Sequence, residues 1–286
     1  MYTGDGNLGI SFHGVNIVLE SRDGPSSTSI GAMEWGDVFH FDDGEDTTSV
    51  VSGFRVLSAH QHGNGGAVTC SSSSPLVRDC VFDNCFSELN GGAVHCHNSS
   101  AVFRNCSFIE CQSDGLGGAI YAAANSTITV SNCLFNYNNT VGDESGIVHL
   151  DTSDATITRC TFAENGGSMI GAVSCAPTIT NCVLSTKTTE IMYCGPLGDP
   201  HITHSVIWSF APTGGDSLCG THHDNIIADP LFCDDTSGDF TLCSNSPCLP
   251  DGNGWSEHVG SLGEGCGPCA PAVEPKGWGA IKALYR

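Results

Sequence analysis

The cysteine pair Cys266 and Cys269 is the first feature of this 286-residue chain that could do chemistry. Two residues, Gly267 and Pro268, separate the thiols, which is the spacing of a dithiol redox motif. Such a motif needs a buried strand before it and a helix after it to lower the pKa of the first thiol. Glycine-rich sequence precedes this pair and proline follows it, so the spacing indicates a structural disulfide.

Histidines form a second group with possible metal or acid–base chemistry. His95 and His97 flank Cys96, and if Cys96 points inward, alternation places both imidazoles on one outer strip. The sequence lacks the fixed ligand spacing that a closed zinc site requires, so we expect adventitious metal binding at most. Further surface candidates are His60, His62, His222 and His223.

Three charged residues suggest the chemistry of polysaccharide cleavage. A lyase that acts on uronates needs a cation to neutralise the substrate carboxylate and a base to remove the neighbouring proton. Arg78 and Arg104 occupy the same position in successive repeats, Arg55 is near, and Asp79 adjoins the strip. The next repeat has Ser131 there, which also fits an ordinary solvated strand face. The paired carboxylates of a glycosidase cannot be picked out.

The acidic stretch at residues 42–46 offers oxygen ligands for a cation. It lies in the unusually long interval between Gly14 and Gly53. Carboxylates in a turn can bind calcium, so calcium is the one candidate cofactor, and the alternative is a solvated turn. The candidate ligands are Asp42, Asp43, Glu45 and Asp46.

All of these groups must be positioned by a repeat that returns every 26 or 27 residues between Gly65 and Asn165. Glycine-led phrases open the repeats, as in GGAVTC and GGAVHC, and phrases such as VRDCVFDNC and FRNCSFIEC close them. A fixed period of this length is the signature of a solenoid, in which each repeat is one coil. No helical period competes with it before the last dozen residues.

Two columns of the closing phrase predict the interior. Cys and Phe stand two positions apart in each repeat, and side chains two apart in a strand share one face. We predict inward ladders of Phe82, Phe108, Phe135 and Phe162, and of Cys80, Cys106, Cys133, Cys160 and Cys182. The glycine-led strand predicts two more, through Val68, Val94, Ile120, Val148, Val173 and Met192, and through Cys70, Cys96, Ala122, Leu150, Cys175 and Cys194.

A bend must lie between the first apolar column and the Cys column, because their spacing of three breaks strand alternation. Asn, Asp and Gly dominate the bend column, and these residues best tolerate a left-handed backbone. The predicted fold is therefore all-β, a single-stranded right-handed parallel β-helix, a pectate-lyase-like solenoid, of about eight coils. The bends are predicted at Gly14, Gly53, Asp79, Asn105, Asn132, Arg159, Asn181 and His204.

The C-terminal part predicts a cap held by disulfides. Past Val206 the repeat fades into sequence dense in Cys, Gly and Pro, and we expect the β-helix over residues 1–230, the cap over 231–270 and a tail over 271–286. The role of the tail Val273–Arg286 is open between a loose end and an export signal. The connectivity cannot be deduced, and an odd total of 17 cysteines leaves at least one unpaired. The candidates are Cys219, Cys233, Cys243, Cys248, Cys266 and Cys269.

Charge and cysteine usage bound the partners. A net charge of −22 with nine Lys plus Arg argues against binding to nucleic acid or an anionic membrane, and we expect no membrane insertion. The cysteine density favours an extracellular or cell-surface location. The sequence at Met1 already reads as the middle of a coil, without a signal peptide, so we expect the natural start to lie upstream. We also expect a monomer.

The repeats resemble a known family. The GGA-[Val/Ile] openings, with Phe-x-x-Asn at Phe135 and Phe162, are similar to those of polymorphic outer-membrane proteins and related secreted bacterial β-helix proteins. Two coils carry Cys85 and Cys111 in place of the Asn, and both can fill the same stack. The resemblance covers about residues 50–210 and implies an adhesin-like surface role. After Cys269 no run of amphipathic strands remains to build a membrane barrel.

Two function classes follow from the sequence. The preferred one is a non-catalytic scaffold that binds polysaccharide or a surface protein along its exposed strands, because packing and backbone geometry account for the conspicuous repeat residues. The alternative is a polysaccharide lyase or glycoside hydrolase, with Arg78, Asp79 and Arg104 as candidate catalytic residues. A fold of this kind hosts both classes, so the site has to decide.

Overall fold

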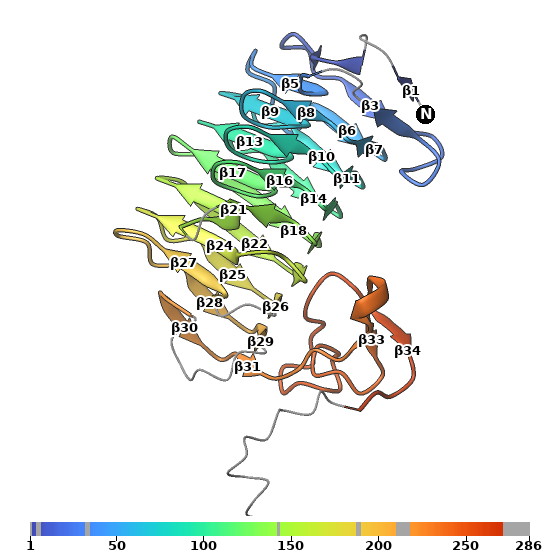
Figure 1. The fold of residues 1–286 in the computed structure, drawn as a ribbon, viewed down its shortest axis with the longest axis vertical. Coiled ribbons are helices and arrows are strands. Elements are labelled where there is room, and N and C mark those ends of the chain that lie inside the picture. The colour runs from blue at the N-terminus through green and yellow to red at the C-terminus, as the bar shows by residue number, and fades with distance from the viewer. Residues whose placement is uncertain are drawn as a thin grey trace, which may run out of the picture.

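The computed structural model shows a parallel β-solenoid with a small cap against its side (Figure 1). It describes residues 2–3, 7–31, 35–141, 144–186, 190–209 and 218–270, so the predicted tail lies outside the described residues. Among the described residues, no helix has the length and apolar character needed to cross a bilayer.

Each turn of the solenoid contributes one short strand to each of up to four parallel sheets. We number the sheets in the order in which the chain passes through them within one turn, as in β9, β10, β11 and β12. Sheet 1 contains β2 (Ile10–Ser11), β5 (Phe39–Phe41), β9 (Val68–Ser71), β13 (Val94–His97), β17 (Ile120–Ala123), β21 (Gly146–Asp151), β24 (Ser168–Val173) and β27 (Met192–Cys194). Sheet 2 contains β3 (Val18–Glu20), β6 (Val50–Ser52), β10 (Leu76–Arg78), β14 (Val102–Arg104), β18 (Thr127–Ser131), β22 (Asp154–Thr158), β25 (Thr178–Thr180), β28 (His201–Thr203) and β30 (Thr221–His223).

The other two sheets complete each turn. Sheet 3 contains β1 (Tyr2–Thr3), β4 (Ser29–Gly31), β7 (Arg55–Leu57), β11 (Val81–Asp83), β15 (Ser107–Ile109), β19 (Leu134–Asn136), β23 (Thr161–Ala163), β26 (Val183–Thr186), β29 (Val206–Ser209) and β31 (Ile226–Ile227). Sheet 4 is short, with β8 (His60–Gln61), β12 (Phe86–Ser87), β16 (Gln112–Ser113) and β20 (Asn139–Thr140).

The bends between sheets 2 and 3 have the left-handed backbone that the sequence predicts. From Gly53 to His204 the predicted bend residues all have φ between 52° and 77°. Gly14 also has a positive φ, but it does not lie at a bend between sheets 2 and 3. Because β2 pairs with β5, Gly14 lies beside Asp43 in the turn between sheets 1 and 2. A bend at Asp224, with φ 55°, was missed. The nine strands of sheet 2 correspond to about nine turns instead of eight.

The Phe column forms a continuous stack in the interior. Phe82, Phe108, Phe135 and Phe162 face one another on β11, β15, β19 and β23, with ring centroids 5.0, 4.7 and 4.5 Å apart. All four side chains are fully buried. Offset stacking of this kind adds to the free energy that burial of each ring already supplies.

The Cys column is buried beside it and consists of free thiols. Each Sγ donates to a carbonyl of the preceding rung, as Cys106 does to Val77 at 3.6 Å and Cys133 to Phe103 at 3.7 Å. Burial raises the pKa of Cys80 to about 11, which keeps that thiol a neutral donor. The column therefore supplies small buried donors at the bends, where the ladder of backbone hydrogen bonds is interrupted.

The column of Cys85, Cys111, Asn138 and Asn165 shows why Cys and Asn interchange in these repeats. Asn138 donates from Nδ2 to the carbonyl of Phe108 at 2.9 Å, and Cys111 donates from Sγ to the carbonyl of Phe82 at 3.5 Å. Both side chains satisfy the equivalent carbonyl one rung back. The Asn makes the stronger bond and also accepts from a backbone N–H.

Two members of the sheet 1 ladders were assigned wrongly from the sequence. Ile170 and Ala172 of β24 occupy the places predicted for Val173 and Cys175. The phrase from Gly171 to Cys175 imitates a glycine-led opening, but Gly166 and Gly167 are the pair that enters this strand. The register is fixed by hydrogen-bonded pairing with β21.

The cap is a separate three-stranded sheet of β32 (Phe232–Asp234), β33 (Asp239–Cys243) and β34 (Glu264–Cys266), with a 3-10 turn at Asp235–Ser237. Its core residues Leu242, Cys248 and Val259 pack on Val183 and Val206 of sheet 3. The disulfides are Cys194–Cys219, Cys233–Cys266 and Cys243–Cys269.

Two disulfide expectations are corrected by these pairings. Cys248 is a free buried thiol. Cys194 keeps its predicted ladder place opposite Ala172 and also bonds Cys219. Cys266 and Cys269 bond to different partners. Their own Sγ atoms are 3.9 Å apart, because strand pairing holds Cys266 beside Cys243.

Candidate functional site

The arginine strip is present, but its central member is already paired. Arg78 and Arg104 face each other across β10 and β14, with Ser52 and Ser131 at the neighbouring positions. The guanidinium of Arg78 lies 2.7 Å from Asp79 and 3.1 Å from Glu20, and Asp79 also accepts from Asn105. These contacts use the groups that a lyase would need for its substrate.

The third arginine of the predicted group belongs to another face. Arg55 is on β7 of sheet 3, where its Nε donates to Asp83 at 2.9 Å. In the described part of the chain Arg104 makes no ion pair and remains exposed. The structure thus leaves one available cation at this place, beside an aspartate that is already engaged.

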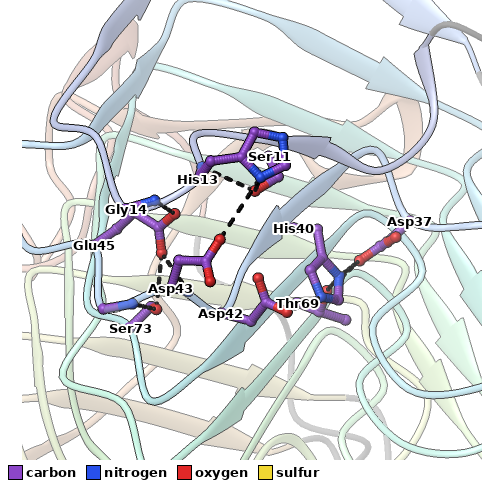
Figure 2. A network of polar contacts seen from close by, with 11 residues as sticks. Ser11, His13, Gly14, Asp37, His40, Asp42, Asp43, Glu45, Thr69 and Ser73 are labelled. Atoms are coloured by element: carbon purple, nitrogen blue, oxygen red, sulfur yellow. Dashed lines mark hydrogen bonds and ion pairs between the residues drawn. The ribbon is translucent and has the colours of Figure 1, made fainter.

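The acidic stretch is divided among separate structural contacts (Figure 2). Glu45 is buried and accepts from the backbone N–H of Gly14 and Asp43 and from the hydroxyl of Ser73, at 2.9–3.1 Å. Burial alone would raise the pKa of Glu45, but these hydrogen bonds outweigh it and lower the pKa below its ordinary value. Its carboxylate closes the turn.

The remaining carboxylates of this stretch point to different partners. Asp46 accepts from the backbone N–H and hydroxyl of Thr48, and Asp43 lies 3.7 Å from His13. Asp42 lies 3.2 Å from Nε2 of His40. The four candidate calcium ligands are thus turned to four different local contacts, in place of one shared centre. Figure 2 shows this for Asp42, Asp43 and Glu45.

A partly buried network next to this stretch was not found from the sequence. Asp37 contacts Nδ1 of His40 at 2.8 Å, and the hydroxyl of Thr69 contacts both residues. Burial would lower the pKa of His40, but the hydrogen bond and charge of Asp37, with the charge of Asp42, raise it above 6.5. His40 thus lies between the Asp37 and Asp42 carboxylates, and its contact with Thr69 joins β5 to β9.

The histidines of β13 point as predicted, with Cys96 buried and His97 exposed. His95 begins a column of rings on the outer side of sheet 1, followed by Tyr121, His149 and Tyr193 at centroid distances of 5.6, 5.8 and 6.3 Å. Tyr121 and His149 are buried even on this outer side. Burial lowers the pKa of both His95 and His149 to about 4, so the rings are neutral and serve as packing.

An exposed aromatic cluster lies over sheet 4, and we call it the Trp35 platform. It consists of Trp35, His60, His62 and Phe86. The Trp35 ring stacks on His62 with centroids 3.9 Å apart and planes at 10°, and it remains 48% exposed. His60 and Phe86 approach the cluster at tilted or edge-on angles. Nδ1 of His62 lies 2.9 Å from a carboxylate oxygen of Glu88.

A pocket of about 190 Å³ lies between the cap and the solenoid. Glu164, Asp229 and Asp235 contribute carboxylates to it, and Trp208 and Phe232 contribute aromatic surface. Its volume is below the roughly 300–1,000 Å³ of ordinary small-molecule sites. The pocket can admit water or a small group and is too small to enclose a sugar chain.

Comparison with known proteins agrees with the topology. Residues 46–144 match the family model described as a right-handed beta helix region. The fold of the chain is a parallel β-helix. A search of curated proteins found no match. The matched residues include Arg78, Asp79 and Arg104, whereas Trp35 and the cap lie outside them. The comparison therefore supports the fold and assigns no function to these residues.

Sequence reasoning missed the Trp35 platform because its members are not in one column of the repeat. His60 and His62 were named as surface candidates, but the signal for Trp35 is only a parallel bridge to His60 from the preceding rung. That bridge depends on the long first interval of the solenoid. The exposed tryptophan itself was the available clue, since large aromatic residues on a surface are concentrated at binding sites.

Proposed function

We propose that this β-helix protein is a non-catalytic scaffold, secreted or displayed on the cell surface, that binds glycan through the Trp35 platform. The observation that carries the proposal is an exposed indole held flat against His62, whose Nδ1 in turn contacts the Glu88 carboxylate. The adhesin-like role implied by the repeats is part of this proposal.

The chemistry of the Trp35 platform suits a sugar ring. A pyranose has a C–H face that packs on an aromatic plane and a rim of hydroxyls that need acceptors. Trp35 offers the plane, and the Glu88 carboxylate offers an acceptor whose side chain is 44% exposed. Stacking on His62 fixes the indole before binding, which reduces the entropy lost on association.

Two observations favour a scaffold over an enzyme. The candidate catalytic residues Arg78 and Asp79 are ion-paired with each other, and the cap pocket is small. The net charge of −22 also favours neutral glycans over acidic ones as ligands. The three disulfides support a location in an oxidising compartment, where such bonds persist.

The test is retardation of the purified chain in gels that contain neutral or acidic polysaccharides. We expect a neutral polysaccharide to retard the protein and Trp35→Ala to weaken the apparent affinity about tenfold or more, as expected for a central aromatic contact. Leu197→Ala is the matched control, because Leu197 is 88% exposed and lies at the other end of the solenoid. Equal retardation of Trp35→Ala and the original chain would overturn the proposal.

The alternative, a hydrolase or lyase, is supported by the three carboxylates and Trp208 at the cap pocket. It is tested by incubating the same polysaccharides with the protein, with and without calcium, and following reducing ends and unsaturated products. Turnover that disappears in Asp229→Asn would place the activity at the pocket. Turnover that disappears in Arg104→Ala would place it on the arginine strip.

A further inference from the structure

Four cysteine sulfurs of the cap converge on one point. The Sγ atom of Cys266 lies 3.6 Å from that of Cys243 and 3.9 Å from that of Cys269, in addition to its bond to Cys233. The ligand atoms of Cys233, Cys243 and Cys266 all lie within 4.8 Å of one another. The disulfides Cys233–Cys266 and Cys243–Cys269 are therefore adjacent, and we call these four residues the cap cysteine centre.

The backbone of the cap brings these residues together by contacts other than the sulfur bonds. Cys243 of β33 pairs with Cys266 of β34, and β32, which carries Cys233, pairs with the other edge of β33. Asn245 fixes the fourth member, because its Oδ1 accepts from the N–H of Cys269 and its Nδ2 donates to the carbonyl of Cys269, both at 2.9 Å. Strand pairing and Asn245 therefore align the four cysteines in addition to the sulfur bonds.

We propose that the cap cysteine centre is a zinc site: in the reduced chain its four thiolates bind one Zn²⁺ ion, and on oxidation the same four sulfurs form the two disulfides. Each disulfide takes two electrons and two protons from a dithiol reductant, which itself becomes a disulfide. The four thiols then release four protons as they bind the ion. Oxidation by a small-molecule disulfide reverses both steps and releases Zn²⁺.

The geometry and the ligand type fit zinc. A tetrahedron with Zn–S bonds of about 2.3 Å has edges of about 3.8 Å between its sulfurs. The two contacts of Cys266 with Cys243 and Cys269 already have this length, at 3.6 and 3.9 Å. The Cys266-x-x-Cys269 spacing is also common in structural zinc sites.

Other cysteines of the chain lack this arrangement. Among the described residues, the Cys column of the solenoid is buried, and each Sγ donates to a carbonyl of the previous rung. Cys194 and Cys219 form an isolated pair, and Cys248 is a lone buried thiol. The cap cysteine centre is thus distinguished by the number of sulfurs that meet and by their accessibility, since Cys233, Cys266 and Cys269 are only partly buried.

The experiment uses the full chain, reduced with a phosphine under nitrogen and titrated with Co²⁺ as a spectroscopic probe for zinc. We expect one equivalent of Co²⁺ to give the visible bands of a tetrahedral site and a near-ultraviolet thiolate charge-transfer band. One equivalent of Zn²⁺ should bleach both, and a glutathione-type disulfide should release the Zn²⁺. The oxidised chain should show no bands.

Variants assign the bands to the site. Cys266→Ser should abolish the four-thiolate spectrum, and Cys233→Ser should shift it to that of a weaker three-sulfur site. The matched control is Cys248→Ser, which removes a buried cap thiol outside the centre and should leave the titration unchanged. A reduced chain that keeps its β-sheet circular dichroism but gives no thiolate bands would overturn the proposal. Four-thiolate bands that persist unchanged in Cys266→Ser, or a reduced cap that Zn²⁺ cannot bring back to proteolytic resistance, would also overturn it.

Discussion

The solenoid and the cap use cysteine in opposite ways. In the solenoid the Cys column remains as free thiols that fill space and donate to carbonyls, and the stacked Phe column beside it supplies the buried area. In the cap a small core of Leu242, Cys248 and Val259 packs on the solenoid, and disulfides join the strands. The difference follows from size, because a segment with few buried residues needs covalent or metal links to stay folded.

The solenoid and the cap are also stabilised by different kinds of contact. Each rung of the solenoid is stabilised by the rungs before and after it, as expected for repeat proteins. The cap has a few specific anchors instead, such as the N–H of Gly260 on the carbonyl of Asn181 at 2.8 Å and the hydroxyl of Tyr137 on the carbonyl of Asp235 at 3.0 Å. Damage to the solenoid should spread, whereas damage to the cap should stay local.

The largest expected effect is therefore in the solenoid. Phe135→Ala removes a fully buried ring that stacks on Phe108 and Phe162, and it should lower the free energy of unfolding by about 3–5 kcal/mol. Denaturant unfolding measures the loss, with Val141→Ala, which is 56% exposed, as the control. A loss below about 1 kcal/mol would mean that the rungs do not depend on their neighbours.

The next largest effect should be confined to the cap. Replacing Cys233 and Cys266 together by Ser opens a disulfide that spans 33 residues, which should cost about 2–4 kcal/mol in the absence of metal. Hydrogen exchange should show faster exchange in β32, β33 and β34 and unchanged exchange in β15 and β19. If the solenoid strands also lose protection, the two regions fold as one unit and the contrast fails.

The smallest effect concerns pH and the first rungs. The pKa of His40 is raised above 6.5 in the folded chain. The contribution of His40 to the free energy of unfolding is therefore complete at pH values below its pKa in the unfolded chain, and it is lost as the pH rises through its pKa in the folded chain. We expect less than about 1 kcal/mol, because the His40 side chain is 40% exposed. Hydrogen exchange of β5 should quicken from pH 6 upward relative to β19, and His40→Gln should flatten this dependence. Hydrogen exchange of β5 that shows no such dependence on pH in the original chain would contradict this role of His40.

Much of the rung geometry could be predicted because its requirements are local and repeated. A bend with positive φ favours Asn, Asp or Gly at one position, and the Phe two places after each Cys must share its face. The same logic failed where one residue type serves several turns. Gly14 has the positive φ expected of a bend, but it lies in a different turn. Gly171 resembles the glycine that opens a repeat, but it lies inside β24, opposite His149.

The candidate sites were harder to predict, because each depends on segments that the repeat does not relate. The sequence placed Arg78 beside Arg104, and only the structure showed that Glu20, from an earlier rung, pairs with Arg78. The acidic stretch suggested a cation site, and the fold gave its carboxylates separate partners. Charge and spacing state which groups are available, whereas tertiary contacts decide which of them are already satisfied.

The sequence by itself determined the fold class, the inward Phe and Cys columns and the left-handed bends, because parallel stacking makes each rung repeat the same steric demand. Only the tertiary structure decided the cysteine pairing in the cap, the stack of Trp35 on His62 and the burial of Glu45. These depend on how long, irregular loops close, and loop closure brings together residues whose spacing carries no period.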